Sequence, residues 1–153
     1  MIIIEKLNRL REWANSERPV DLLFIALNEV SAEMSNRIFN SEKGYRDIYG
    51  NAPKPTYSDP YKKVRENYKP ARQTKVVDFE LTGSLRRSLD TVRDANNIKL
   101  VLRNDAEALI SKYLEKYRGT IVFEMSEDEL KLFNQIASEL LIKDIKKIFN
   151  ETL

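Results

Sequence analysis

The stretch 126-SEDELKLFNQIASELLIKDIKKIFN-150 carries the clearest structural pattern in the chain. Ser126, followed three residues later by Glu129, forms a capping box, in which each side chain accepts a backbone N–H at the start of a helix. Beyond it, apolar residues at helical spacing continue to the end of the stretch: Leu132, Ile136, Leu140, Ile145 and Phe149. We therefore predict a long C-terminal helix over about 127–150.

A second long helix is predicted near the N-terminus, over about 19–40. After Pro19, a residue suited to the first turn of a helix, the apolar positions recur every three or four residues: Leu23, Leu27, Val30, Met34 and Ile38. The same spacing predicts a shorter helix over 2–13. The apolar stripe widens at the start of the second helix, which leaves two interpretations open: burial in the core, or contact with another subunit.

The second half of the chain predicts a small antiparallel sheet. Residues 76–81 and 120–123 are rich in β-branched and other apolar residues, which are typical of strands. Residues 91–95 and 98–102 flank Asn96-Asn97, and Asn tolerates the positive φ of a two-residue hairpin turn. Apolar and polar residues alternate mostly along 98–103, so one face of this sheet needs a helix packed on it.

Two further helical segments lie beside the predicted strands. Residues 84–89 have the length of one helical turn or a bend after Gly83. Asn104 or Asp105 can cap a helix that ends at Gly119. The predicted fold is α+β: a small antiparallel sheet with a long N-terminal and a long C-terminal helix packed on it.

Residues 44–75 form an extended central arm without long periodicity. Ser58-Asp59-Pro60 predicts one short helix, to about residue 67. Five of the seven tyrosines of the chain lie in this arm: Tyr45, Tyr49, Tyr57, Tyr61 and Tyr68. Disordered segments are poor in aromatic residues, so we expect the arm to become ordered by docking onto another polypeptide.

The arm is also locally basic. Between Lys54 and Lys75, seven basic side chains stand against two acidic ones, which leaves a charge of +5. Arg and Tyr are favoured at protein interfaces, whereas basic residues interleaved with aromatic ones also suit single-stranded nucleic acid. A solvated loop without a partner is the third interpretation. We favour a protein interface and keep a nucleic-acid-binding accessory protein as the alternative.

Length and composition bound the remaining possibilities. The chain has 153 residues, so we expect a single structural domain over 1–153. Its 26 basic and 24 acidic residues leave a net charge of +2, too small to indicate a nucleic-acid or membrane surface by itself. The apolar residues 1–4 run directly into Glu5 and Lys6, and no stretch approaches the about 18 apolar residues of a membrane span. We expect neither a signal peptide nor a membrane partner.

The sequence offers little for catalysis. It contains no Cys and no His, which removes the thiolate nucleophile, the common zinc ligands and the side chain that titrates near neutral pH. Phosphate-loop, dinucleotide and hydrolase motifs are missing, and the acidic run 127–129 is typical of a helix start rather than of acid–base chemistry. We expect no enzymatic activity, no cofactor and no metal.

Three segments carry a recognisable pattern: 57-YSDPYKKVR-65, 72-RQT-74 and 77-VDFELTGSLRRSL-89. Together they resemble tail-completion and minor tail proteins of tailed bacteriophages, in which a basic arm leads into a Leu-Thr-Gly-x-Leu-x-x-Ser turn, then strands and a C-terminal helix. The resemblance covers about residues 50–150. The chain departs from it at 108-ALI-110 and 118-RGTIVF-123, where many relatives carry Tyr-Ala-x-x-x-x-x-Gly and Arg-x-Pro-Phe elements.

The resemblance implies a structural virion protein, synthesised in the host bacterial cytoplasm, that forms a ring at the neck or tail end. The ring would join the head connector to the tail, so its partners would be copies of itself and neighbouring neck, connector or tail-tube proteins. In that role the arm would reach a neighbouring subunit, and the Thr82-Gly83 turn would return the chain to its own domain. The candidate interface residues are Tyr57, Tyr61, Arg65, Arg72, Thr82, Gly83, Leu85 and Arg86.

Overall fold

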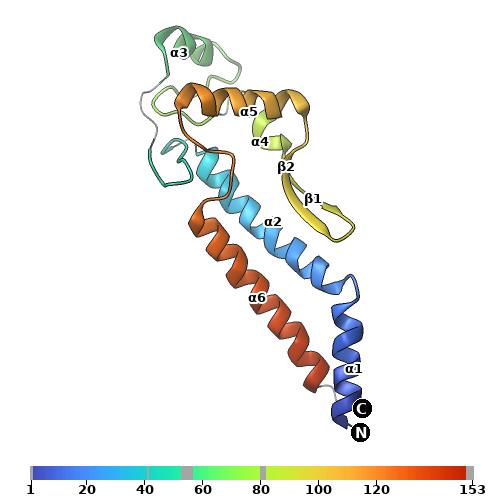
Figure 1. Cartoon of the computed structure of the whole chain (residues 1–153). Helices are drawn as coiled ribbons and strands as arrows, with labels where there is room; N and C mark the ends of the chain where they lie inside the picture. The colour runs from blue at the N-terminus through green and yellow to red at the C-terminus, as the bar shows by residue number, and fades with distance from the viewer. Residues whose placement is uncertain (1, 41, 53–56, 80–81, 151–153) are drawn as a thin grey trace.

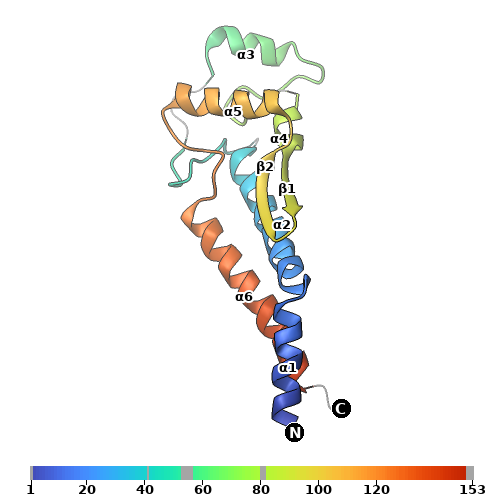
Figure 2. The ribbon, with the colours of Figure 1, turned by 45° about the vertical axis from the view of Figure 1, so that its right-hand side comes forward.

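The computed structural model describes residues 2–40, 42–52, 57–79 and 82–150, which form an elongated α+β molecule (Figures 1 and 2). Its elements follow in the order α1 (Ile2–Ala14), α2 (Arg18–Ile38), α3 (Asp59–Glu66), α4 (Ser84–Ser88), β1 (Leu89–Asp94), β2 (Asn97–Leu102), α5 (Asp105–Arg118) and α6 (Glu127–Asn150). The strands form an antiparallel pair. The predicted α+β class, with long helices near both ends of the chain, is confirmed.

Helix α2 is the central element of the fold. It lies between α6 and the β-hairpin and packs against both (Figure 1). Its buried side chains recur at helical spacing: Leu22, Ala26, Leu27, Val30, Met34 and Ile38. Helix α6 runs beside α2 in the opposite direction (Figures 1 and 2). One face of a two-stranded sheet is wide enough for a single long helix. Helix α2 therefore packs on the hairpin, and α6 packs on the opposite side of α2.

Local capping determines where the later helices begin and end. The backbone N–H of Ser126 donates to the Glu129 carboxylate at 2.7 Å, and the N–H of Glu129 donates to Ser126 Oγ at 3.2 Å. The predicted capping box of α6 is therefore confirmed. At α5, the side chain of Asn104 accepts the N–H of Ala106 at 2.9 Å, and Gly119 ends the helix with φ +67°.

The hairpin turn lies one residue earlier than the sequence indicated. Asp94 pairs with Asn97, so the two loop residues are Ala95 and Asn96 rather than Asn96-Asn97. Ala95 takes φ +48°, in the left-handed region. Core packing, rather than the turn, sets the register of the hairpin. Leu100 and Leu102 of β2 pack against the core, and a shift of one residue would turn both side chains outward.

Two of the predicted strands do not form. Residues 76–79 and 120–123 are irregular, and residues 80 and 81 of the first run lie outside the described residues. Both segments are instead tied to the loop after α2: the Tyr45 N–H donates to the Val77 carbonyl at 2.7 Å, and the Ile48 N–H to the Ile121 carbonyl at 3.0 Å. One β-branched residue of each segment, Val77 and Val122, is buried in the core without strand pairing.

The described parts of the arm, residues 44–52 and 57–75, fold onto their own chain. Tyr45 and Tyr57 are buried in the core cluster with Met34 and Ile38, and the Tyr45 ring stacks on Phe79 with 4.5 Å between ring centroids. For these two tyrosines the expectation of docking onto another polypeptide is wrong, because the chain's own core orders this part of the arm. The predicted short helix is confirmed as α3.

Candidate protein-interface site

A cavity of about 590 Å³ lies between α3, α5 and the segment that enters α4. These elements are at the end of the molecule away from α1 (Figures 1 and 2). The lining of the cavity is mostly apolar and aromatic, with main contributions from Tyr57, Tyr61, Leu85, Ile110, Tyr113 and Tyr117. We call this cavity the aromatic groove. Grooves of this size and composition are suited to binding apolar side chains of a partner.

Helix α5 forms one wall of the aromatic groove. Its inner side packs on the core through Leu114. On its outer side Tyr113 and Tyr117 are 67% and 69% exposed, and their rings stack with centroids 6.3 Å apart. The i, i+4 spacing places both rings on one helix face. Two large aromatic side chains therefore stand in solvent beside the groove.

Helix α3 forms the opposite wall and is held by a buried ion pair. Arg65, only 1% exposed, donates from Nη2 to both carboxylate oxygens of Asp78 at 2.9 and 3.1 Å, and its guanidinium lies 4.4 Å from the Tyr57 ring centroid. The Tyr57 hydroxyl donates to Asp78 at 2.9 Å. Burial raises the pKa of the Tyr57 phenol well above its ordinary value, so the hydroxyl remains a donor at physiological pH.

The turn before α4 forms the base of the groove. Gly83 takes φ +77°, a conformation that favours glycine. A Cβ at this position would lie 2.7 Å from Nη1 of Arg87. The Thr82 hydroxyl accepts the N–H of Ser84 at 3.1 Å, which starts the short helix and directs Leu85 inward. The predicted turn at Thr82-Gly83 is confirmed.

Glu107 is the acidic residue in the groove lining. It lies in the first turn of α5, where the helix dipole favours negative charge, and it is 8% exposed. Within the described ranges, no hydrogen bond or ion pair joins its side chain to another residue. Its oxygens are not among the fully buried polar atoms without a partner, so they reach the groove surface and offer a binding position for a cationic group of a partner.

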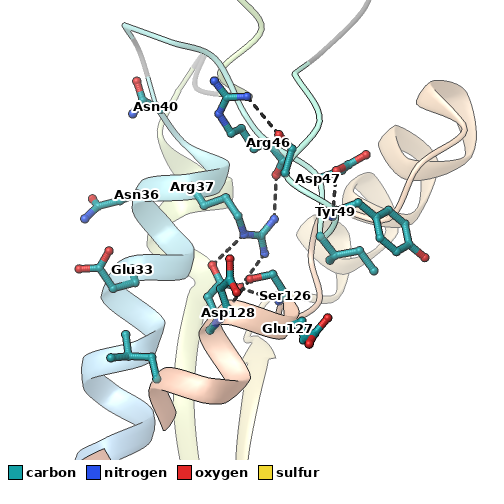
Figure 3. A pocket seen from close by; sticks show the side chains of 14 residues that line it. Glu33, Asn36, Arg37, Asn40, Arg46, Asp47, Tyr49, Ser126, Glu127 and Asp128 are labelled. Carbon is teal, nitrogen blue, oxygen red and sulfur yellow. Dashed lines mark hydrogen bonds and ion pairs between the residues drawn. The ribbon is translucent and has the colours of Figure 1, made fainter. Parts of the chain in front are cut away.

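A second, polar pocket of about 850 Å³ lies between the end of α2, the loop that follows it and the start of α6 (Figure 3). Arg37 projects into it and donates to both Glu129 oxygens at 2.7 and 3.1 Å. The same guanidinium donates to the backbone carbonyls of Arg46, Val122 and Glu124 at 2.6–3.0 Å. Because these donors hold three segments together, we assign this pocket a structural role.

The eight predicted interface residues divide into two groups. The aromatic groove brings together Tyr57, Tyr61, Thr82 and Leu85. The others surround it: Gly83 shapes the turn, Arg86 is exposed on α4, and Arg65 and Arg72 secure α3, with the Arg72 N–H donating to the Arg65 carbonyl at 2.9 Å.

One of these predictions needs correction. Arg65 is 1% exposed and paired within its own chain, so its side chain cannot reach a neighbouring subunit as proposed from the sequence, whereas Tyr57 and Leu85 are largely buried but line the groove. The Arg65 guanidinium is equally unable to grip a nucleic-acid backbone, because Asp78 neutralises it in the interior. Local sequence does not show that Arg65 and Asp78, 13 residues apart, will meet.

The sequence predicted the helix that carries the α5 aromatics but assigned no role to Tyr113 and Tyr117, which line the groove. Leu109, Ile110, Tyr113 and Tyr117 are all exposed. The sequence carried no signal that this face is open, since apolar residues at 109, 110, 113, 114 and 117 fall on one ordinary helix face.

Comparisons with protein-family models, curated proteins and solved structures found no match to this chain. In the parts of the chain that the structure describes, no group of acidic side chains is arranged to hold a metal ion, and none of the helices combines the length and apolarity needed to cross a bilayer. The aromatic groove is the candidate functional site.

Proposed function

We propose that this chain is a structural, non-catalytic subunit of a tailed-phage virion. It assembles with copies of itself into a ring at the neck or tail end and joins the head connector to the tail. The observation that carries the proposal is the composition of the aromatic groove. Residues from 57–65 and 77–89, two of the segments that resemble tail-completion proteins, line it together with residues of α5.

The apolar surface of α5 supports an assembly role. Leu109, Ile110, Tyr113 and Tyr117 are exposed, and burying each would contribute up to about 1.5–3 kcal/mol. Association itself costs at least about 4 kcal/mol in lost translational and rotational freedom. One such contact therefore gives modest affinity, whereas a closed ring gives every subunit two contacts and a durable assembly.

The proposal is tested by complementation of phage assembly. Deleting the gene from its phage should yield filled heads and unattached tails, and adding the purified protein should restore joined, infectious particles. Electron microscopy counts the joined particles, and a Tyr49→Ala protein, altered at an exposed residue outside the groove, serves as a positive control. Normal yields of joined particles without the protein would reject the proposed role.

A further inference from the structure

The outer face of α1 carries an unpartnered apolar stripe. Ile3, Ile4 and Leu7 are 75%, 64% and 53% exposed, although α1 packs on α6 and on the start of α2. Arg11 is exposed one turn beyond Leu7. Ile4, Leu7 and Arg11 follow i, i+3, i+7 spacing, so they lie along one face of the helix, with the cation at its far end.

The aromatic groove has the complementary chemistry. Its walls present Ile110 and Tyr113, and Glu107 lies one turn from Ile110, without an ion pair to another side chain of the described residues. An apolar stripe that ends in a cation therefore matches an apolar groove that ends in an anion. Arg118 lies at the other end of α5, away from Glu107.

The spacing of the docking residues along α1 also matches the spacing along α5. Ile4 and Arg11 are seven residues apart, which is about 10 Å along a helix. Glu107 and Leu114 on α5 are separated by the same seven residues. Laying the two helices antiparallel places Arg11 at Glu107 and Ile4 near Leu114, with Leu7 between the tyrosine and isoleucine side chains of the groove wall.

The two surfaces lie at opposite ends of the elongated molecule (Figures 1 and 2). Helix α2 separates them, and its 21 residues span about 30 Å at 1.5 Å per residue. A chain therefore cannot place its own α1 in its own groove. A second copy of the chain can, since each copy has both surfaces.

We propose that α1 of one copy docks into the aromatic groove of the next, with Arg11 paired to Glu107. This contact joins two different surfaces, so it is head-to-tail, and repeating it closes a ring or continues as a filament. The inference rests on the proposed function, because it supplies the contact between ring subunits. It also pairs the Glu107 carboxylate at the groove with a cation.

Two charge-reversal variants test the pairing. Arg11→Glu alone and Glu107→Arg alone should each weaken self-association on the order of 30-fold or more, measured by sedimentation of the full chain. Mixing the two variants should restore assembly, because the α1 of each variant then carries the charge opposite to that in the groove of the other. Restoration upon mixing also shows that both variants fold. Glu12→Arg, an exposed change beside Arg11, is the control and should assemble normally.

Cysteine trapping tests the position independently. The natural chain has no Cys, and Leu7 and Tyr113 are both exposed. Mild oxidation of a Leu7→Cys and Tyr113→Cys mixture should give the mixed dimer, whereas oxidising either variant alone should give little dimer. Dimers formed only by like variants would overturn the head-to-tail arrangement.

The outcomes separate this inference from the proposed function. A ring that forms normally despite both charge reversals and gives no mixed disulfide would overturn α1-to-groove docking and leave the ring intact. A chain that stays monomeric at all concentrations but joins heads to tails would overturn self-docking and indicate that another virion protein fills the groove. Self-association as described, without any effect on phage assembly, would leave the docking and reject the virion role.

Discussion

Arg65 is the side chain that most directly fixes α3, and hence one wall of the aromatic groove. Replacing it with Met removes the cation while Asp78 stays buried beside the Tyr57 hydroxyl. Breaking one side of a buried ion pair costs about 3–5 kcal/mol. We expect Arg65→Met to lower the free energy of unfolding by that amount, measured by urea denaturation followed by circular dichroism.

The matched control is Lys63→Met, on the exposed face of the same helix. It removes one positive charge at a position without a buried partner, so its effect should stay within about 0.5 kcal/mol. Similar losses for the two variants would mean that the pair with Asp78 does not hold α3.

Ala95 offers a stabilising change at the hairpin turn. Its φ of +48° places Cβ close to the following carbonyl, which costs about 1–2 kcal/mol for a residue other than glycine. Ala95→Gly should raise the free energy of unfolding by about 1 kcal/mol. Part of this gain is offset because glycine increases the conformational entropy of the unfolded chain. Thermal unfolding measures the change. Ala71→Gly, at a residue without positive φ, should give no gain.

At the scale of elements, the sequence predicted what depends on neighbours along the chain. The capping box at Ser126 and the helix-ending Gly119 act within a few residues, so the helices they bound were predictable. Residues 76–79 and 120–123 were wrongly predicted as strands because a strand needs a partner at the right distance, which composition does not supply. The prediction that Arg65 of the arm contacts a neighbouring subunit was wrong for a similar reason. Arg65 pairs with Asp78 only through the tertiary fold, which the local sequence does not show.

The contact between α6 and the first two helices gives a pH prediction. The Asp144 carboxylate accepts from the Trp13 indole at 2.9 Å and from Arg18 at 3.0 and 3.1 Å. The hydrogen bond from Arg18 chiefly holds the pKa of Asp144 below its ordinary value of 3.8. A lowered pKa in the folded state means that the contribution is complete above the unfolded pKa and is lost as the pH falls through the folded one.

We therefore expect Asp144→Asn to unfold more readily than the natural chain at pH 7. The difference should shrink below about pH 4 and vanish once Asp144 of the natural chain is protonated. Urea midpoints between pH 7 and pH 3 provide the measurement. Asp94→Asn, exposed at the end of β1, should differ little from the natural chain at neutral pH. A difference for Asp144→Asn that persists undiminished at pH 3 would contradict this assignment.

At the scale of the whole molecule, the elongated shape separates regions of different stability. Helix α2 is buried between α6 and the hairpin, whereas α1 packs at one end, with its outer face open (Figure 1). Opening of α1 breaks few buried contacts, so its amides should exchange with solvent well before those of α2. We expect exchange in α1 to be at least about tenfold faster than in α2 in the dilute, monomeric chain.

Assembly should slow amide exchange in α1, and this slowing should depend on Arg11. If α1 docks into the groove of the next copy, raising the protein concentration should slow exchange in α1, because opening it then also breaks the subunit contact. The Arg11→Glu chain, which cannot pair with Glu107, should keep fast exchange in α1 at the same concentration. Hydrogen–deuterium exchange with mass spectrometry resolves the helix peptides. Equal slowing of α1 in both chains would show that another part of the molecule makes the subunit contact.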